Sequence, residues 1–370
     1  MDTFSMTESG IIFEDLEGKA GRLNGYFPHV IELSSSDLLA AFVTGRSMDS
    51  IDASTMVSSS SDGGRTWGIP RRLLAGTDEK RPATDSCKLT YLGNGRIAAF
   101  GYRFFRDDPE VPVGNPDTGG VLDDEVFFLL SEDYGKTFCS PAAVPVSFAE
   151  PVEASAPLTV LSNGHWVSPI ANFLDWQGRT ESGTYGRMLR SEDEGKTWND
   201  AAVTMRFPEK STCTWEQRAC EMEKGEVIVI SWVEDIMKGT RYPNHVSLST
   251  DYGKTFGSPI STGIMGQAAS IHYLGDNRVL SLHCIRRDTD HPGILACIAE
   301  VFHDSWHEIS RRMIWEPEPF SPDASRHEVF AYLKFGQPSA LKLHDGDWML
   351  SFWYEHEGVS RILWRRFRID

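Results

Sequence analysis

The stretch Ser60-Ser61-Asp62-Gly63-Gly64-Arg65-Thr66-Trp67 sets a pattern that returns three more times along the 370-residue chain. Each copy reads Ser-x-Asp-x-Gly-x-Thr followed by Trp or Phe, and the later copies begin at Ser131, Ser191 and Ser249. In such a turn the Asp side chain accepts hydrogen bonds from backbone N–H groups, and the Gly adopts a positive φ. The aromatic ring packs beneath the turn. The pattern therefore predicts four equivalent turns, each following a β-strand.

A second repeat lies upstream of each of these turns. It consists of an apolar strand, a tight polar turn and another apolar strand. Two further copies, at 269–285 and 337–354, lack the eight-residue pattern. Six such units predict an all-β chain, a six-bladed β-propeller with four repeated turns, in one domain spanning residues 1–370. We expect the N-terminal run 10–17 to pair with the C-terminal strand 361–369, because this pairing would complete the last blade and cover its edge.

The four repeated turns resemble the Asp-box of the sialidase-like β-propellers, also called the neuraminidase or BNR repeat. The resemblance implies that these turns lie at the outer end of each blade, far from the substrate. Ligand contacts would then come from the starts of the first strands and from the loops between second and third strands, at the opposite end of the channel. It also implies a carbohydrate-active enzyme.

The resemblance also suggests where acidic residues of a site would stand. In the family, the loop after the second strand of the first unit carries the acid/base Asp, and Asp49 and Asp52 both lie within reach of that position. Glu216 matches the Glu that pairs with the nucleophilic Tyr, and Glu355 matches a Glu that steadies an arginine. Candidate sugar contacts at the same end of the propeller are Arg46, Arg103, Arg218, Arg241, Arg287, Trp215, Trp353 and Gln337.

Three departures from the family pattern argue against an efficient sialidase. The segment Tyr26-Phe27-Pro28 stands where sialidases have Tyr-Arg-Ile-Pro, whose Arg begins the carboxylate clamp. The segment Gln337-Pro338-Ser339 matches the run that carries the nucleophilic Tyr, and Val233 stands where a second clamp Arg is expected. The sequence therefore favours an exo-acting glycoside hydrolase that acts on the end of a different glycan.

Two other functions remain open from the sequence. A polysaccharide lyase acting beside a uronic acid would need a base, for which His29 or His245 is available. A non-catalytic propeller that binds carbohydrate or protein is the other alternative, because the same fold serves many functions. No HxH or HExxH spacing occurs, so we expect no metal and no other cofactor.

Composition narrows the partners and the compartment. The formal net charge of −17 argues against nucleic acid and anionic membranes as partners and leaves a sugar or oligosaccharide as the expected ligand. No run of about eighteen apolar residues predicts a membrane span. The N-terminus lacks a basic segment followed by an apolar core, which favours a cytoplasmic protein. The six cysteines form no CxxC pair, and we expect them to be free thiols.

Overall fold

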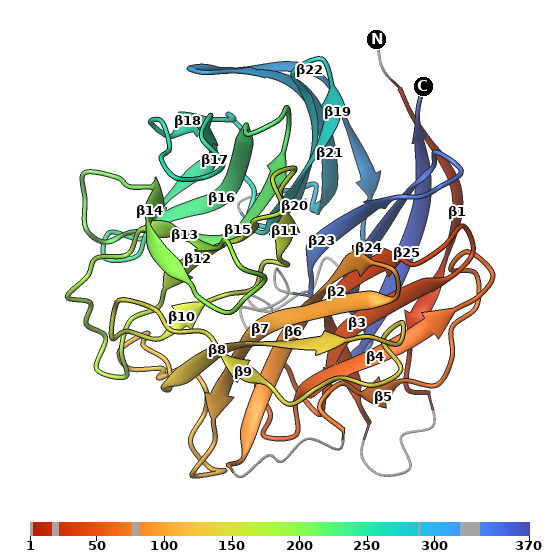
Figure 1. Cartoon of the computed structure of the whole chain (residues 1–370), viewed down its shortest axis with the longest axis horizontal. Coiled ribbons are helices and arrows are strands. Elements are labelled where there is room, and N and C mark those ends of the chain that lie inside the picture. Colours follow the sequence, from red (N-terminus) through yellow and green to blue (C-terminus); the bar gives the residue numbers. More distant parts are fainter. Residues whose placement is uncertain (1–2, 17–21, 76–80, 288, 319–333) are drawn as a thin grey trace.

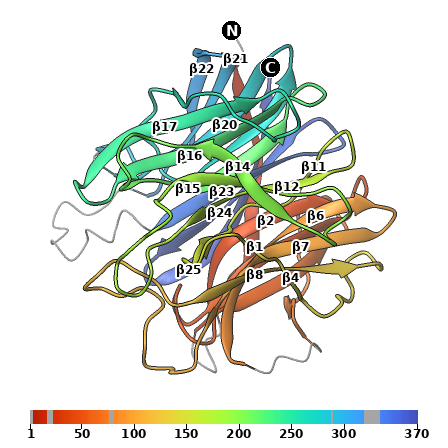
Figure 2. The same ribbon diagram turned by 60° about the vertical axis from the view of Figure 1, so that its left-hand side comes forward.

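In a computed structural model the chain is described at residues 3–16, 22–75, 81–287, 289–318 and 334–370. Within these ranges all regular elements are β-strands, and no helix occurs. The strands form six antiparallel sheets arranged around a common axis (Figure 1), and a second view shows how the sheets twist as they fan outward (Figure 2). The predicted six-bladed β-propeller is confirmed.

Each blade runs from an inner strand to an outer strand, and the first five follow the chain in order. Blade one is β2 (Asn24–Glu32), β3 (Leu38–Gly45), β4 (Ser54–Ser60) and β5 (Arg71–Arg72). Blade two is β6 (Ala83–Gly93), β7 (Arg96–Phe105), β8 (Asp124–Ser131) and β9 (Ala142–Ala143). Blade three is β10 (Val152–Glu153), β11 (Thr159–Val160), β12 (Trp166–Asn172), β13 (Gly186–Ser191) and β14 (Asn199–Met205).

The remaining blades follow the same plan. Blade four is β15 (Thr212–Glu221), β16 (Val227–Asp235), β17 (Thr240–Ser249) and β18 (Ile260–Ser261). Blade five is β19 (Ala269–Gly275), β20 (Arg278–Ile285), β21 (Gly293–Phe302) and β22 (Ser305–Trp315). Blade six is β23 (Phe335–Lys342), β24 (Trp348–His356), β25 (Val359–Ile369) and β1 (Phe4–Phe13).

The two ends of the chain close blade six, as the sequence predicts. Strand β1 lies antiparallel to β25, with Phe4 opposite Ile369 and Gly10 opposite Trp364, and the two strands lie side by side in Figure 1. The closing strand begins earlier than the predicted run 10–17 and ends at Phe13; the last residue of that run, Glu17, lies outside the described residues. Closure leaves β1 as the outer strand of the blade.

Apolar side chains between neighbouring blades form the core. Between blades five and six, for example, Leu282 and Ile298 pack against Phe335, Phe352 and Phe367, and all five are fully buried. Burying one such side chain contributes roughly 1.5–3 kcal/mol. The apolar alternation along each strand thus holds the blades together and fixes where the inner strands lie.

The four repeated turns share one set of hydrogen bonds, seen clearly at Asp133. Its carboxylate accepts the Thr137 hydroxyl at 2.6 Å, the Thr137 N–H at 2.9 Å and the Ser131 hydroxyl at 2.8 Å. These bonds lower the pKa of Asp133 to about 2. Gly135 takes a φ of 76° and donates its N–H to Ser131 Oγ at 2.9 Å. The corresponding bonds recur in the turns at Asp62, Asp193 and Asp251.

The repeated turns lie at the opposite end of the sheets from the starts of the inner strands. In blade one, Ser60 pairs with Leu38 at one end of β3, whereas Tyr26 pairs with Val43 near the other end. The turns join third to fourth strands there. They therefore support the blades without approaching the end of the channel where the inner strands begin.

Deleting β1 (Phe4–Phe13) should destabilise the protein by several kcal/mol, which is of the order of a whole folding margin. The deletion exposes the edge of β25 and the apolar face that Phe4 covers in the blade five to blade six core. Thermal melting of the truncated chain beside the full chain measures the loss. Equal melting temperatures would contradict this role of β1.

Replacing Asp133 with Ala should cost about 1–3 kcal/mol of unfolding free energy at neutral pH through lost turn hydrogen bonds. Because folding lowers the pKa of Asp133, the carboxylate stabilises the fold above its ordinary pKa of 3.8 and loses this effect as pH falls through about 2. Urea unfolding should show a difference in unfolding free energy between the variant and the parent protein at pH 7. This difference should be smaller at pH 2–3. A variant as stable as the parent protein at pH 7 would refute this account of the turn.

Candidate functional site

Three inner strands carry a β-bulge close to where they begin. The pairing registers shift between Tyr26 and His29 in β2, between Trp215 and Arg218 in β15, and between Gly336 and Ser339 in β23. A bulge turns one extra side chain out of the regular alternation and is frequent next to functional sites.

The residue inside each bulge adopts a left-handed backbone. Phe27 has a φ of 54°, Glu216 of 48° and Gln337 of 43°. For residues other than glycine such a conformation costs about 1–3 kcal/mol, so it persists only where surrounding contacts enforce it. Three blades thus present one strained residue each, and all three line the same pocket.

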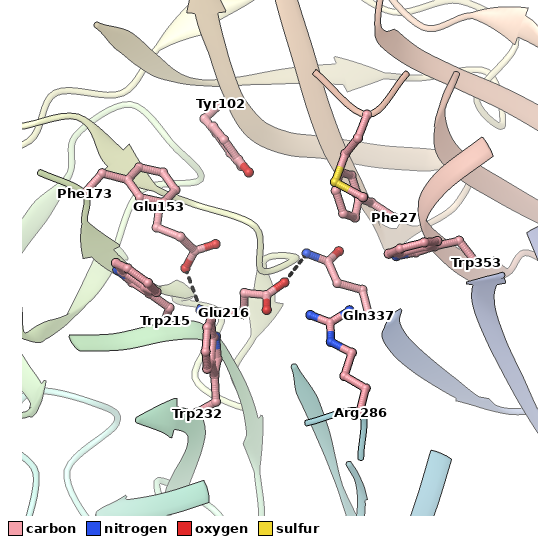
Figure 3. Close-up of a pocket in the computed structure, with 11 residues that line it drawn as sticks. Phe27, Tyr102, Glu153, Phe173, Trp215, Glu216, Trp232, Arg286, Gln337 and Trp353 are labelled. Carbon is pink, nitrogen blue, oxygen red and sulfur yellow. Dashed lines mark hydrogen bonds between the residues drawn. The ribbon is translucent and has the colours of Figure 1, made fainter. Parts of the chain in front are cut away.

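The pocket has a volume of about 230 Å³ and lies where the inner strands converge (Figure 3). This is below the roughly 300–1,000 Å³ typical of sites for drug-sized ligands, so a small ligand or the end of a larger one suits it best. Its apolar walls come from Phe27, Met48, Phe173, Trp215, Trp232 and Trp353. Its polar groups come from Tyr102, Glu153, Glu216, Arg286 and Gln337.

Two carboxylates line this pocket, and each is held by its own set of hydrogen bonds. Gln337 Nε2 donates a hydrogen bond to Glu216 Oε1, and Figure 3 shows the pair meeting across the pocket. Glu153 accepts the backbone N–H groups of Glu216 and Ser155, each at 3.0 Å. Burial raises the pKa of Glu153, although the Ser155 hydrogen bonds and the charge of Arg218 oppose the shift. Glu153 thereby holds the strained backbone of Glu216 in place.

Arg286 supplies the positive charge in the pocket. Its side chain is almost fully buried; Nε donates to Gln267 Oε1, and Nη1 donates to the Phe335 carbonyl at 2.6 Å. No carboxylate of the described chain forms an ion pair with it, and Figure 3 shows the guanidinium pointing toward Glu216 and Gln337. The group is held in place by neutral partners, and its charge faces the ligand space.

A smaller side pocket of about 50 Å³ adjoins the main one and shares Phe27, Met48 and Tyr102 with it. Asp49 lines this side pocket from the loop after β3. The residue as a whole is exposed, but the neighbouring protein removes enough water from its carboxyl to raise its pKa, against the opposing charge of Arg106. Asp49 is therefore placed to hold a proton at the edge of the pocket.

Asp52, the other predicted acid, has different surroundings. It is exposed and forms an ion pair with Arg46 at 3.3 Å. Partial burial acts to raise the pKa of Asp52, but hydrogen bonds from Ser50 and the Arg46 backbone outweigh it, and the net shift is downward. Neither Asp49 nor Asp52 lines the main pocket of about 230 Å³.

Several predicted sugar contacts lie outside the pocket lining and have protein partners of their own. Arg103 is bound by Glu125 at 2.7 Å, and Arg287 by Glu234 at 3.2 Å. Buried Arg218 donates to Ser155 Oγ at 3.1 Å. Arg241 lies on β17 opposite Glu234 of β16, and Glu355 lies on β24 opposite Ser360 of β25; neither residue lines the pocket.

The two predicted histidine bases also lie outside the pocket lining. His29 follows the bulge of β2; burial and the charges of Lys88 and Arg218 lower its pKa to about 3, and its Nδ1 is buried without a partner. The His245 ring bonds the Pro243 carbonyl through Nδ1 at 2.8 Å and packs edge-on against Phe207. Burial lowers the pKa of His245 as well.

Sequence reasoning located part of this pocket and missed the rest. Trp215, Glu216, Gln337 and Trp353 line it, as the blade pattern suggests. The missed residues Tyr102, Arg286 and Trp232 each stand directly beside a position singled out in the sequence: Arg103, Arg287 and Val233. Tyr102 and Trp232 lie in β7 and β16, where successive residues face opposite sides, so an error of one position exchanges an inward for an outward side chain. Arg286 directly follows the end of β20. Glu153 and Phe173, in the third blade region, were also missed, because nothing in the sequence around them distinguishes them as site residues.

Metal-ligand clusters, disulfides and membrane-spanning helices are the remaining features to report for the described residues. No group of three or more His, Cys, Asp or Glu side chains in the described ranges is arranged to hold a metal ion. The six cysteines, all described, are free. A search of the described residues for a helix long and apolar enough to cross a membrane found none.

The six blades and the pocket at their axis form a six-bladed β-propeller whose fold is similar to that of solved sialidases. Among solved structures, a protein of unknown function from Dyadobacter fermentans is similar over 99% of both chains, with 21% identity and a TM-score of 0.74. A Hadza microbial sialidase matches 93% of this chain (15% identity, TM-score 0.64), and the Trypanosoma rangeli sialidase in complex with the inhibitor DANA matches 99% (16% identity, TM-score 0.64). This chain spans only 65% and 60% of those two sialidases.

Comparisons at the level of sequence found no match. No protein-family profile matches the chain, and no curated protein sequence matches it. The likeness to sialidases is therefore a likeness of fold.

Replacing Glu153 with Ala should destabilise the protein by about 1–3 kcal/mol for each backbone N–H, of Glu216 and Ser155, that loses its acceptor. Glu153→Gln keeps an acceptor oxygen and should lose less. Urea unfolding of the two variants beside the parent protein tests this order. Equal losses in both variants would mean that the hydrogen bonds to Glu216 and Ser155 are not what Glu153 contributes.

Proposed function

We propose that the chain is an exo-acting glycoside hydrolase whose pocket binds the terminal sugar of a glycan. The observation that carries the proposal is one small pocket that combines aromatic walls with two carboxylates and a buried arginine. Aromatic rings such as Trp215, Trp232 and Trp353 suit the apolar faces of a sugar, and the polar groups suit its hydroxyls. The limited volume favours a chain end over the middle of a polysaccharide.

Asp49 and Glu216 are the proposed acid and its partner carboxylate. Glycoside hydrolases use one carboxylic acid to protonate the leaving oxygen and a second carboxylate to activate water or attack the sugar. A raised pKa suits Asp49 to the first role. Glu216 accepts a hydrogen bond from Gln337 through Oε1, which holds its carboxyl group at the pocket and suits the second role. Arg286 would contact an anionic or hydroxyl group of the same sugar.

The proposed substrate is a sugar other than a sialoside. A sialidase site needs positive charge around the substrate carboxylate and a nucleophilic Tyr, which the resemblance would put at Tyr26-Phe27 and within the run Gln337-Pro338-Ser339. Here an apolar ring and an amide line the pocket instead. Charge-assisted hydrogen bonds contribute about 1.5–3 kcal/mol each, so a sialoside would lose much of its binding.

A panel of aryl glycosides that includes an aryl sialoside, assayed from pH 4 to 8, tests the reaction class. We expect turnover of at least one neutral or uronic glycoside above that of the sialoside. A product absorbing in the near ultraviolet from a uronic substrate would instead indicate a lyase. A sugar that raises the melting temperature with no turnover anywhere would indicate a binding propeller, and the fastest turnover on the sialoside would contradict the proposal.

With the best substrate of that panel, Asp49→Asn should lower kcat by about 10²–10⁴-fold, the usual contribution of general acid catalysis. Asp52→Asn is the matched variant, because it removes the same charge from the same loop but at a carboxylate that Arg46 binds. Melting temperatures of both variants should stay near that of the parent protein. If Asp52→Asn loses the activity and Asp49→Asn keeps it, the assignment is reversed.

A further inference from the structure

Lys88 is a buried cation that contacts the pocket residues from behind. It lies on β6, the inner strand of blade two, and only 2% of its surface is exposed. Its Nζ donates hydrogen bonds to the Phe27 carbonyl at 2.5 Å and to Gln337 Oε1 at 3.2 Å. Both partners are the left-handed residues of their bulges. One ammonium thus joins the strained segments of blades one and six.

The chemistry of the neighbours determines which way the Gln337 amide faces. An ammonium group has only donors, so the amide must turn its oxygen toward Lys88. Its Nε2 then points the other way and donates to Glu216 Oε1. An ionised carboxylate has only acceptors, so the arrangement satisfies every member when Lys88 is protonated and Glu216 is ionised. A neutral Lys88 amine both donates and accepts, so Lys88 then no longer requires the amide oxygen to face it, and only Glu216 still orients the amide.

The charges around Lys88 act in both directions. The net result is a pKa of about 7: burial is the largest cause of the lowering and Arg218 acts in the same direction, while Glu216, Cys87 and Glu153 oppose the shift. From β2, His29 carries a pKa of about 3, and from β19, His272 carries one of about 4, so both are neutral near pH 7. From β7, Tyr102 has a pKa raised well above its ordinary value and is neutral as well.

We propose that Lys88 is a positioning residue, whose ammonium orients the Gln337 amide and thereby holds Glu216 as a hydrogen-bond acceptor facing the pocket. The proposal deepens the hydrolase proposed above and rests on it for the role of Glu216. Lys88 itself does not line the pocket. The constraint that its ammonium places on the amide is present below about pH 7 and is lost as pH rises through that value.

The side-chain amide of Gln337 reports on this arrangement without any substrate. In ¹⁵N-labelled protein its NH₂ resonances are assigned by their absence from Gln337→Met. We expect one proton shifted by the bond to Glu216 at pH 6, and we expect this shift to disappear with a midpoint near pH 7. Lys88→Met should remove the shift at every pH. Lys342→Met removes an exposed lysine from the same strand as Gln337 and should leave it unchanged.

Kinetics with the best glycoside of the panel give the second measurement. Lys88→Met should lower kcat at least tenfold with a smaller effect on KM. We expect the parent protein to lose activity above about pH 7, and Lys88→Met should not show this loss. Lys342→Met should keep the parental pH profile.

The outcomes separate the two proposals. If no glycoside is hydrolysed, the hydrolase proposal fails, while the amide resonances still test the link from Lys88 to Gln337. Should Lys88→Met fail to fold, the pH titration of the parent protein alone decides. An amide shift that is constant from pH 5 to 9, or a folded Lys88→Met with parental kcat and pH profile, would overturn the role of Lys88.

Discussion

The pairing of β1 with β25 is the constraint on which the rest of the molecule depends. It completes the sixth sheet with the first strand of the chain and so closes the ring of blades. Closure brings the inner strands of all blades together around one axis, because each blade packs its apolar face against the next. Residues as far apart in sequence as Lys88 and Gln337 meet only for this reason. The pocket is a product of closure and belongs to no single blade.

Convergence of the inner strands also explains why the pocket is both polar and strained. Water is largely excluded near the axis, so each buried polar group there needs a protein partner. Glu153 binds the backbone of Glu216, Gln337 binds its side chain, and Lys88 binds Gln337. These contacts come from different blades and hold the left-handed residues against their conformational cost. We expect side chains held in this way to move little when a ligand binds. Their charges and hydrogen-bonding groups would then be preorganised for the reaction.

The sequence predicts the architecture well because local signals repeat. The recurring turn needs only one Asp, one Gly and neighbouring hydroxyls, and these are visible in eight residues. Prediction is weaker where a contact depends on closure: the inner strand of blade three divides into β10 and β11, and β1 begins six residues before the predicted run. Glu153 and Lys88 read as ordinary polar strand residues, since nothing local indicates that closure buries them. Tyr102 and Trp232 were missed because alternation along β7 and β16, set by register, decides which neighbour faces inward.

A crystal of the Asp49→Asn variant soaked with the glycoside that the parent protein hydrolyses fastest tests this account most directly. The account predicts one intact sugar ring in the pocket, against Trp215, Trp232 or Trp353, with residue 49 and Glu216 both facing the glycosidic bond. A sugar bound instead in the cleft beside Trp67 and Tyr134, near the repeated turns, with the axial pocket empty, would contradict it.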